Sequence, residues 1–146
     1  MNFEKLLNEG KIELVDKTEF EIEQVLKDIN FAKNGLETGN YNRIMAIAYE
    51  TVLMAGNRLM NFLGYRSIGK EHYKNTFEFL EKCSIDKELV FYFNKIRIKR
   101  NNFVYRGADE ISKSEAEQII KKAENLVQEI RTFVQEIRTK RKDKDA

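Results

Sequence analysis

The chain has 146 residues, of which 42% are apolar and 34% are charged, and its formal net charge is +2 at pH 7. This length and composition fit one globular domain and exclude an intrinsically disordered chain. No apolar run approaches the roughly 18 residues of a membrane span, and the opening "MNFEKLLNEGK" lacks the apolar core of a signal peptide. We therefore expect a cytoplasmic protein without a membrane anchor. Proline is absent, which favours an all-helical chain because proline breaks helix interiors.

The first two predicted helices cover residues 18–37 and 41–63. The first has one apolar face at the helical period, and Gly35 and Gly39 mark its end. The second is apolar almost all round, which is typical of a helix buried on several sides. Gly64 follows it as a left-handed cap, and Gly56 inside it indicates a close crossing by another helix.

Three further helices are predicted, over residues 70–83, over 86–105 and from Ser112 onward. Ser112 and Glu115 form an S-x-x-E capping box. The apolar residues that follow repeat at threes and fours along one seam: Ala116, Ile119, Ala123, Leu126, Ile130, Phe133 and Ile137. No strand is predicted. The expected fold is all-α: an antiparallel up-down bundle of four long helices plus one shorter helix, in a single domain 1–146 with a frayed polar tail over 138–146.

Basic residues are concentrated in the middle of the chain. Residues 1–40 carry a net charge of −4, residues 41–107 carry +6, and residues 108–146 carry 0. The stretch "KIRIKRNNFVYRG" has five cations and no acid. Its cations are Lys95, Arg97, Lys99, Arg100 and Arg106. This pattern is either a solvated helix face or a site for an anion, such as the phosphate of RNA or of a nucleotide.

Arg100 occupies an apolar position of the helix over 86–105. The apolar stripe consists of Leu89, Tyr92, Phe93, Ile96, Arg100, Phe103 and Val104. An arginine there either extends toward solvent or serves a function at a cleft or a dimer seam. A second, more polar stripe consists of Phe91, Asn94, Ile98, Asn101 and Tyr105. It contacts either another protomer or a neighbouring helix of the same bundle.

The order of these elements resembles the HEPN superfamily of small helical domains, which are usually dimeric and carry an Arg-x4-6-His motif on a late helix. "GNYNRIMAIAYETVLMAGNRLMNFLGYRS" resembles the long buried helix and its turn, and "RIKRNNFVYRGADEIS" resembles the motif region. The resemblance places the motif arginine at Arg100 and the next polar residue at Asn101. It places Tyr105 where the family has histidine.

The exchange of histidine for Tyr105 bears on catalysis. Metal-free RNA cleavage needs groups that take and give protons near neutral pH. Histidine titrates near pH 6.5, whereas tyrosine, with a pKa of about 10, is a poor base. The resemblance therefore implies a homodimeric RNA- or nucleotide-binding module in which Arg100, Asn101 and Tyr105 are candidate catalytic positions.

Two other functions stay open. The first alternative is a metal-independent endoribonuclease, for example a toxin, in which Arg100 stabilises the phosphate and Tyr105 or His72 transfers the proton. Alternatively, the protein is an interaction subunit that pairs with a small nucleotidyltransferase, as some members of the family do. No cofactor and no metal site are expected, because one histidine, one cysteine and no acidic cluster leave no recognisable ligand set. Cys83 is expected to be a small buried residue.

Overall fold

The computed structural model describes the backbone of residues 1–106 and 111–145 and the side chains of residues 1–101 and 111–144. Its elements, in chain order, are α1 (Glu4–Asn8), β1 (Ile12–Leu14), α2 (Glu23–Asn34), the 3-10 helix η1 (Gly35–Thr38), α3 (Tyr41–Leu63), β2 (Tyr65–Ser67), α4 (His72–Glu81), α5 (Lys87–Arg106) and α6 (Lys113–Asp145). The chain is 75% helical, and the all-α prediction is confirmed.

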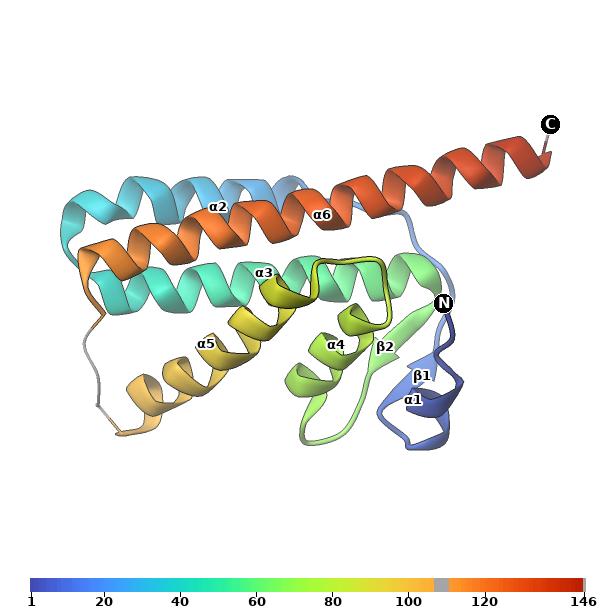
Figure 1. Ribbon diagram of the computed structural model, residues 1–146, viewed down its shortest axis with the longest axis horizontal. Coiled ribbons are helices and arrows are strands. Elements are labelled where there is room, and N and C mark those ends of the chain that lie inside the picture. Colours follow the sequence, from blue (N-terminus) through green and yellow to red (C-terminus); the bar gives the residue numbers. More distant parts are fainter. Residues whose placement is uncertain (107–110, 146) are drawn as a thin grey trace.

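Helix α3 is the centre of the fold and contacts α2, α4, α5 and α6. In Figure 1, α2, α3 and α6 lie along the long axis, and α5 crosses below α3 at an angle, with α4 beside it. The direction of α2 and α5 is opposite to that of α3 and α6, as expected for an up-down bundle. Because α3 is apolar on nearly every side, it can be covered by helices on both of its faces.

The glycines have the roles that the sequence predicts. Gly39 and Gly64 adopt the left-handed conformation, with φ of 78° and 95°, where residues with a side chain are strained. The Gly64 N–H caps α3 through the carbonyl oxygens of Met60 and Asn61. A Cβ placed on Gly56 would lie 3.0 Å from Thr76 Cγ2. The crossing partner of α3 at Gly56 is therefore α4.

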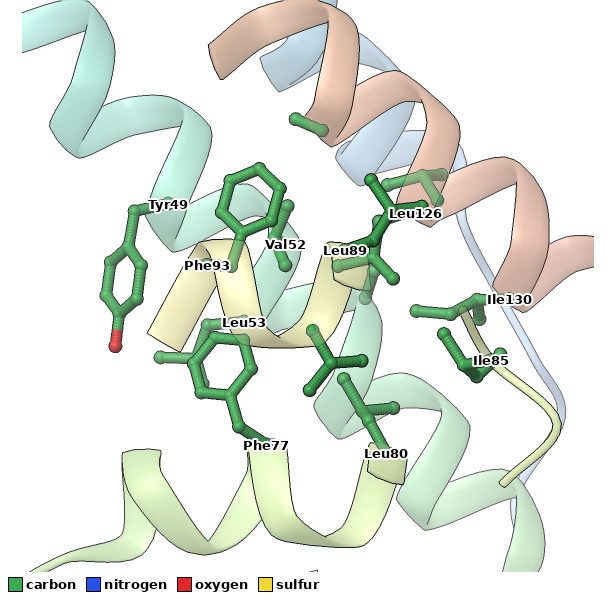
Figure 2. Close-up of a cluster of buried hydrophobic side chains, with 14 of the residues drawn as sticks. Tyr49, Val52, Leu53, Phe77, Leu80, Ile85, Leu89, Phe93, Leu126 and Ile130 are labelled. Atoms are coloured by element: carbon green, nitrogen blue, oxygen red, sulfur yellow. The ribbon is translucent and has the colours of Figure 1, made fainter. Parts of the chain in front are cut away.

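The core follows the predicted apolar faces. In α6, all members of the predicted seam are buried except Ile137, which packs against the core from a half-buried position. Figure 2 shows the part of the core where side chains of α3, α4, α5 and α6 meet, including Val52, Phe77, Phe93 and Leu126. The expected cap of α6 is also present, since the Glu115 N–H donates to Ser112 Oγ over 3.1 Å.

The prediction that the chain has no strand is wrong for two segments. Strands β1 and β2 pair antiparallel, with Glu13 opposite Arg66, and these two residues form an ion pair. Each strand has three residues, too few to show an alternating pattern. The N-terminal helix α1 was also not predicted, because five residues make little more than one turn.

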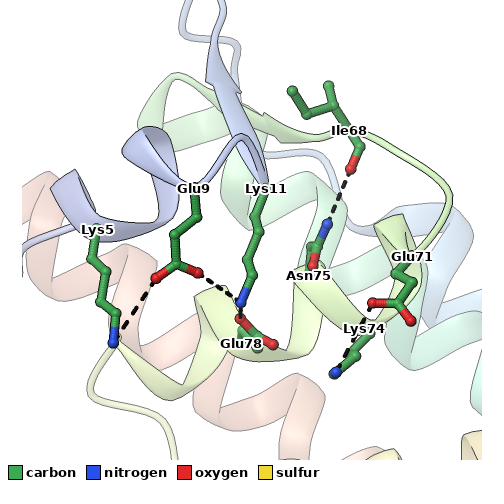
Figure 3. Close-up of polar contacts among 8 residues, drawn as sticks. All are labelled: Lys5, Glu9, Lys11, Ile68, Glu71, Lys74, Asn75 and Glu78. Atoms are coloured by element: carbon green, nitrogen blue, oxygen red, sulfur yellow. Dashed lines mark hydrogen bonds and ion pairs between the residues drawn. The ribbon is translucent and has the colours of Figure 1, made fainter.

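The N-terminal segment, residues 1–15, packs against α4 and forms an ion pair with it. Lys11 Nζ lies 2.8 Å from Glu78 Oε2 and 2.9 Å from Glu9 Oε2 (Figure 3). The Phe3 ring stacks on Phe79, with 4.1 Å between the ring centres. Asn75 donates to the carbonyl oxygen of Ile68 over 3.0 Å, which ties α4 to the turn after β2. Thus the segment before α2 is part of the core of the domain.

Helix α6 continues to Asp145, so residues expected to form a frayed tail are helical. Two arginines explain why helix continues past the apolar seam. Arg138 donates to the carbonyl oxygen of Phe20 over 3.4 Å, and the Arg141 guanidinium lies 4.5 Å from the centre of the Phe62 ring. Their guanidinium groups thus attach the first turn of this extension to Phe20 and Phe62.

Candidate functional site

Arg100 extends the buried face of α5 and is itself largely covered. One turn before it, Ile96 is buried, and the Arg100 side chain is 19% exposed. Arg100 Nη2 donates to Glu50 Oε1 of α3 over 3.0 Å, and the Glu50 side chain is 55% exposed. The guanidinium therefore does not extend into bulk solvent; it lies between α5 and α3 with a carboxylate at its outer side.

Beneath the guanidinium lies the ring of Tyr49, which sequence reasoning did not single out. Arg100 Cζ is 5.8 Å from the ring centre, within the range of a cation–π contact. Tyr49 is 1% exposed, and Figure 2 shows its hydroxyl pointing away from the apolar cluster. Within the described residues, neither the Tyr49 hydroxyl nor Arg100 Nε has a hydrogen-bond partner, although both atoms are buried. Such unsatisfied groups are rare in native proteins, and each calls for a specific explanation, such as a catalytic role or a bound ion.

The electrostatics keep the Tyr49 hydroxyl protonated. Burial raises the pKa of Tyr49 to about 12, against the opposing effect of the positive charges on Arg97 and Arg100. At neutral pH the phenol is therefore a hydrogen-bond donor, like Arg100 Nε. Two buried donors, for which the described residues offer no acceptor, thus lie at the junction of α3 and α5.

The remaining cations of the basic stretch are less free than the sequence suggests. Lys99 Nζ lies 2.9 Å from Glu115 Oε2, and this hydrogen bond holds the pKa of Glu115 below its ordinary value. The basic stretch contains no acid, but acids of other helices pair with two of its cations. Glu115 of α6 pairs with Lys99, and Glu50 of α3 pairs with Arg100. Arg97 Nε donates to Asn94 Oδ1 over 3.1 Å, and Lys95 lies over the Phe91 ring at 4.6 Å. Among the described residues, these contacts of Lys95 and Arg97 are with uncharged groups, so no carboxylate there neutralises these two cations.

The second stripe of α5 is partly uncovered. Phe91 is 59% exposed and Ile98 is 55% exposed, whereas Asn94 and Asn101 are half-buried. These two exposed apolar side chains lie two turns apart on α5, with the half-buried Asn94 between them. Within the part of the chain that the structure describes, no helix covers Phe91 and Ile98.

Two predicted site residues, Tyr105 and Arg106, have side chains outside the described residues, so their roles stay predictions. His72 is the first residue of α4 and is exposed. Its Nδ1 lies 3.1 Å from the carbonyl oxygen of Gly69, and its ring packs edge-on against Tyr73. Among described residues, no contact joins His72 to Arg100.

Cys83 is buried, and burial raises the pKa of its thiol to about 12 from an ordinary value of 9.0. This difference lowers the thiolate fraction about 1000-fold at pH 8. We expect a thiol reagent to label the native protein only as fast as it unfolds, and to label it completely in urea. Fast labelling of the folded protein, followed by absorbance, would contradict this expectation.

Neither a metal cluster nor a membrane span is found in the described residues. No group of three or more His, Cys, Asp or Glu side chains is close enough there to hold a metal ion. No helix in the same residues is long and apolar enough to cross a membrane.

A family model described as the HEPN domain matches residues 18–133. The chain belongs to the HEPN domain family. The match extends from just before α2 into α6 and includes the whole of α5, so Arg100 and its partners Tyr49 and Glu50 lie within the HEPN domain. Strand β1 and helix α1 precede the matched region. No curated protein matches the chain.

Proposed function

We propose that this HEPN-domain protein binds RNA or a nucleotide as a homodimer, with a phosphate group held by Arg100. The observation that supports this proposal most strongly is the environment of Arg100, a largely covered guanidinium whose buried Nε has no partner among the described residues. A guanidinium matches the geometry of phosphate oxygens and binds them through charge-assisted hydrogen bonds. Lys95 and Arg97, on the same helix, add positive charge along the approach.

Binding without cleavage is the form of the proposal that the residues favour. The resemblance places Tyr105 at the position of the family's histidine, and a phenol with an ordinary pKa is a poor base at neutral pH. His72 is the one histidine of the chain, and its described contacts are with Gly69 and Tyr73. We therefore assign phosphate binding to Arg100. We assign proton transfer to neither Tyr105 nor His72.

The homodimer is proposed to form through the outer face of α5. Phe91 and Ile98 would supply the apolar contacts, and Asn94 and Asn101 would set the register between the two copies. Association through this face would bring two copies of α5, and hence two Arg100 sites, near one another. A monomer by light scattering at high micromolar concentration would contradict this part of the proposal.

RNA binding is best tested with Arg100→Gln, which removes the charge and keeps much of the side-chain volume. We expect the affinity for a single-stranded RNA, measured by fluorescence anisotropy in EDTA, to fall about 10- to 100-fold. Arg131→Gln, at an exposed position of α6, is the charge-matched control and should fall by less than about threefold. Binding of the unmodified protein should weaken as salt rises.

Two results would overturn the assignment, and a third would support it. Equal binding by Arg100→Gln and Arg131→Gln would contradict the role of Arg100. Cleavage of the RNA in EDTA by the unmodified protein, lost in Arg100→Gln, would replace binding by endoribonuclease activity. Cleavage that appears only in Tyr105→His would support a binding module built on a nuclease scaffold.

A further inference from the structure

We propose that the Tyr49 hydroxyl and the Arg100 guanidinium together form a site for a terminal phosphate group, and that Glu50 occupies its outer edge until the phosphate displaces it. This inference rests on the proposed function and specifies both the ligand and the regulation of the same site. It assigns roles to two neighbouring residues of α3, Tyr49 and Glu50.

The first argument is the pair of unsatisfied donors. Tyr49 is 1% exposed and Arg100 Nε is buried, yet neither the hydroxyl nor Nε has an acceptor within the described residues. Both groups can only gain by meeting an oxygen atom, since a buried donor without an acceptor has lost its hydrogen bonds to water. One oxyanion with several oxygens can satisfy both donors at once.

The second argument is the balance of charge around Tyr49. The groups whose charges act on its hydroxyl are Arg97 and Arg100, which are positive, Glu50, which is negative, and Tyr73, a phenol. The positive charges around the hydroxyl therefore outnumber the negative one, and displacing the carboxylate leaves the surroundings more favourable to an anion. The carboxylate is an anion already bound to Arg100 Nη2, at 3.0 Å, and it marks the position of one oxygen of the incoming group.

The third argument concerns which phosphate fits. The Tyr49 hydroxyl and Arg100 Nε are both buried, so an anion can reach them only once the Glu50 carboxylate has turned away, and it then meets them with one end first. A terminal phosphate has three free oxygens, one for each of the donors Nε, Nη2 and the Tyr49 hydroxyl, and it approaches two negative charges at pH 7. An internal phosphodiester has two free oxygens and one charge, and its chain continues on both sides. The geometry thus favours the 5′-phosphate of a nucleotide or of an RNA end.

Glu50 fits the role of a displaceable competitor. Its side chain is 55% exposed, so its carboxylate can turn into water with little loss of hydration. A phosphodiester carries one negative charge, like the Glu50 carboxylate, and so competes with it for Arg100 without an advantage in charge. A dianionic terminal phosphate carries two and has that advantage. The Glu50 contact should therefore sharpen the preference for phosphate ends.

The experiment compares three probes at pH 7.5: a short RNA with a 5′-phosphate, the same RNA with a 5′-hydroxyl, and AMP. We expect the unmodified protein to bind the phosphorylated RNA about tenfold more tightly than the hydroxyl form. AMP separates a free nucleotide from an RNA end as the source of the phosphate. Affinities are measured by anisotropy for the RNAs and by calorimetry for AMP.

Two substitutions test the individual roles. Tyr49→Phe removes only the hydroxyl and should reduce the preference for the 5′-phosphate to about threefold or less. Glu50→Gln removes the competing charge and should tighten binding of both RNAs, with the larger gain for the hydroxyl form, so that the preference for the 5′-phosphate falls. The controls are Tyr65→Phe, a half-buried tyrosine of β2, and Glu117→Gln, an exposed acid of α6. Both should bind like the unmodified protein.

The outcomes separate this inference from the proposed function. If the two RNAs bind equally and Tyr49→Phe changes nothing, the terminal-phosphate site is overturned while RNA binding stands. If Glu50→Gln weakens binding, the carboxylate positions Arg100 and does not compete, and the displacement model is overturned. If neither RNA nor AMP binds, the proposed function itself fails.

Discussion

Phe93→Ala should lower the free energy of unfolding by about 4 kcal/mol, the usual cost of removing a buried phenylalanine ring. Phe93 is fully buried in α5, and Figure 2 shows it in the cluster that joins α3, α5 and α6. Its loss would leave a cavity that the surrounding side chains of the cluster fill only in part. Urea unfolding followed by circular dichroism measures the change.

The same helix offers a matched control two positions earlier. Phe91 has the same side chain but is 59% exposed. The Lys95 ammonium nitrogen lies 4.6 Å from the centre of its ring. Phe91→Ala should change the free energy of unfolding by less than about 1 kcal/mol. A similar loss in both variants would mean that the two faces of α5 are assigned wrongly. If Phe91 forms the dimer contact, its replacement should instead shift the protein toward monomer.

Gly56→Val should lower the free energy of unfolding by about 3 kcal/mol, because α3 and α4 cross at this residue without room for a branched side chain. A Cβ there would lie 3.0 Å from Thr76 Cγ2 and 3.3 Å from Leu80 Cδ1. Thr76 is held in place by its hydroxyl, which donates to Asn57 Oδ1 over 2.9 Å and lies 2.8 Å from Ser67 Oγ. Separating the helices would disturb these partly buried hydrogen bonds as well as the packing.

A double-mutant cycle identifies the contact. In Gly56→Ala, the gain in helix propensity of about 1 kcal/mol offsets the crowding, so the net change should be small. Thr76→Ser removes the methyl group that a Cβ would meet and keeps the hydroxyl for its partners. Gly56→Ala should therefore stabilise the Thr76→Ser background, with a coupling of at least about 0.5 kcal/mol in thermal unfolding. Additive effects would show that Thr76 does not limit the crossing.

Helix α3 was predictable from the sequence because its signals are local. The predicted range 41–63 is the observed one, and the glycine on either side adopts a left-handed conformation. The strands were not predictable for the opposite reason. Glu13 and Arg66 are 53 positions apart, and each strand has three residues, so pairing is decided by tertiary contacts.

For the candidate site, the helical wheel placed Arg100 on the apolar face of α5, where the structure shows it largely covered, but it could not supply the partners. Glu50 lies 50 positions before Arg100, and Glu115 lies 16 positions after Lys99. Both acids come from other helices, so the absence of acids within the stretch overstated its free positive charge. One signal was present, since Glu50 is the sole acid in α3, and a lone acid in an apolar helix calls for a cationic partner. Tyr49 had no such signal.

The attachment of the N-terminal segment has a consequence for the order of folding. Its contacts join residues that are distant in sequence. Lys11 and Glu78 are 67 positions apart, and β1 pairs with β2 although α2 and α3 lie between them in the sequence. Closing loops of this length costs more chain entropy than joining successive helices. We therefore expect α2, α3 and the later helices to assemble first, and residues 1–15 to attach in a late step whose rate depends on a preformed α4.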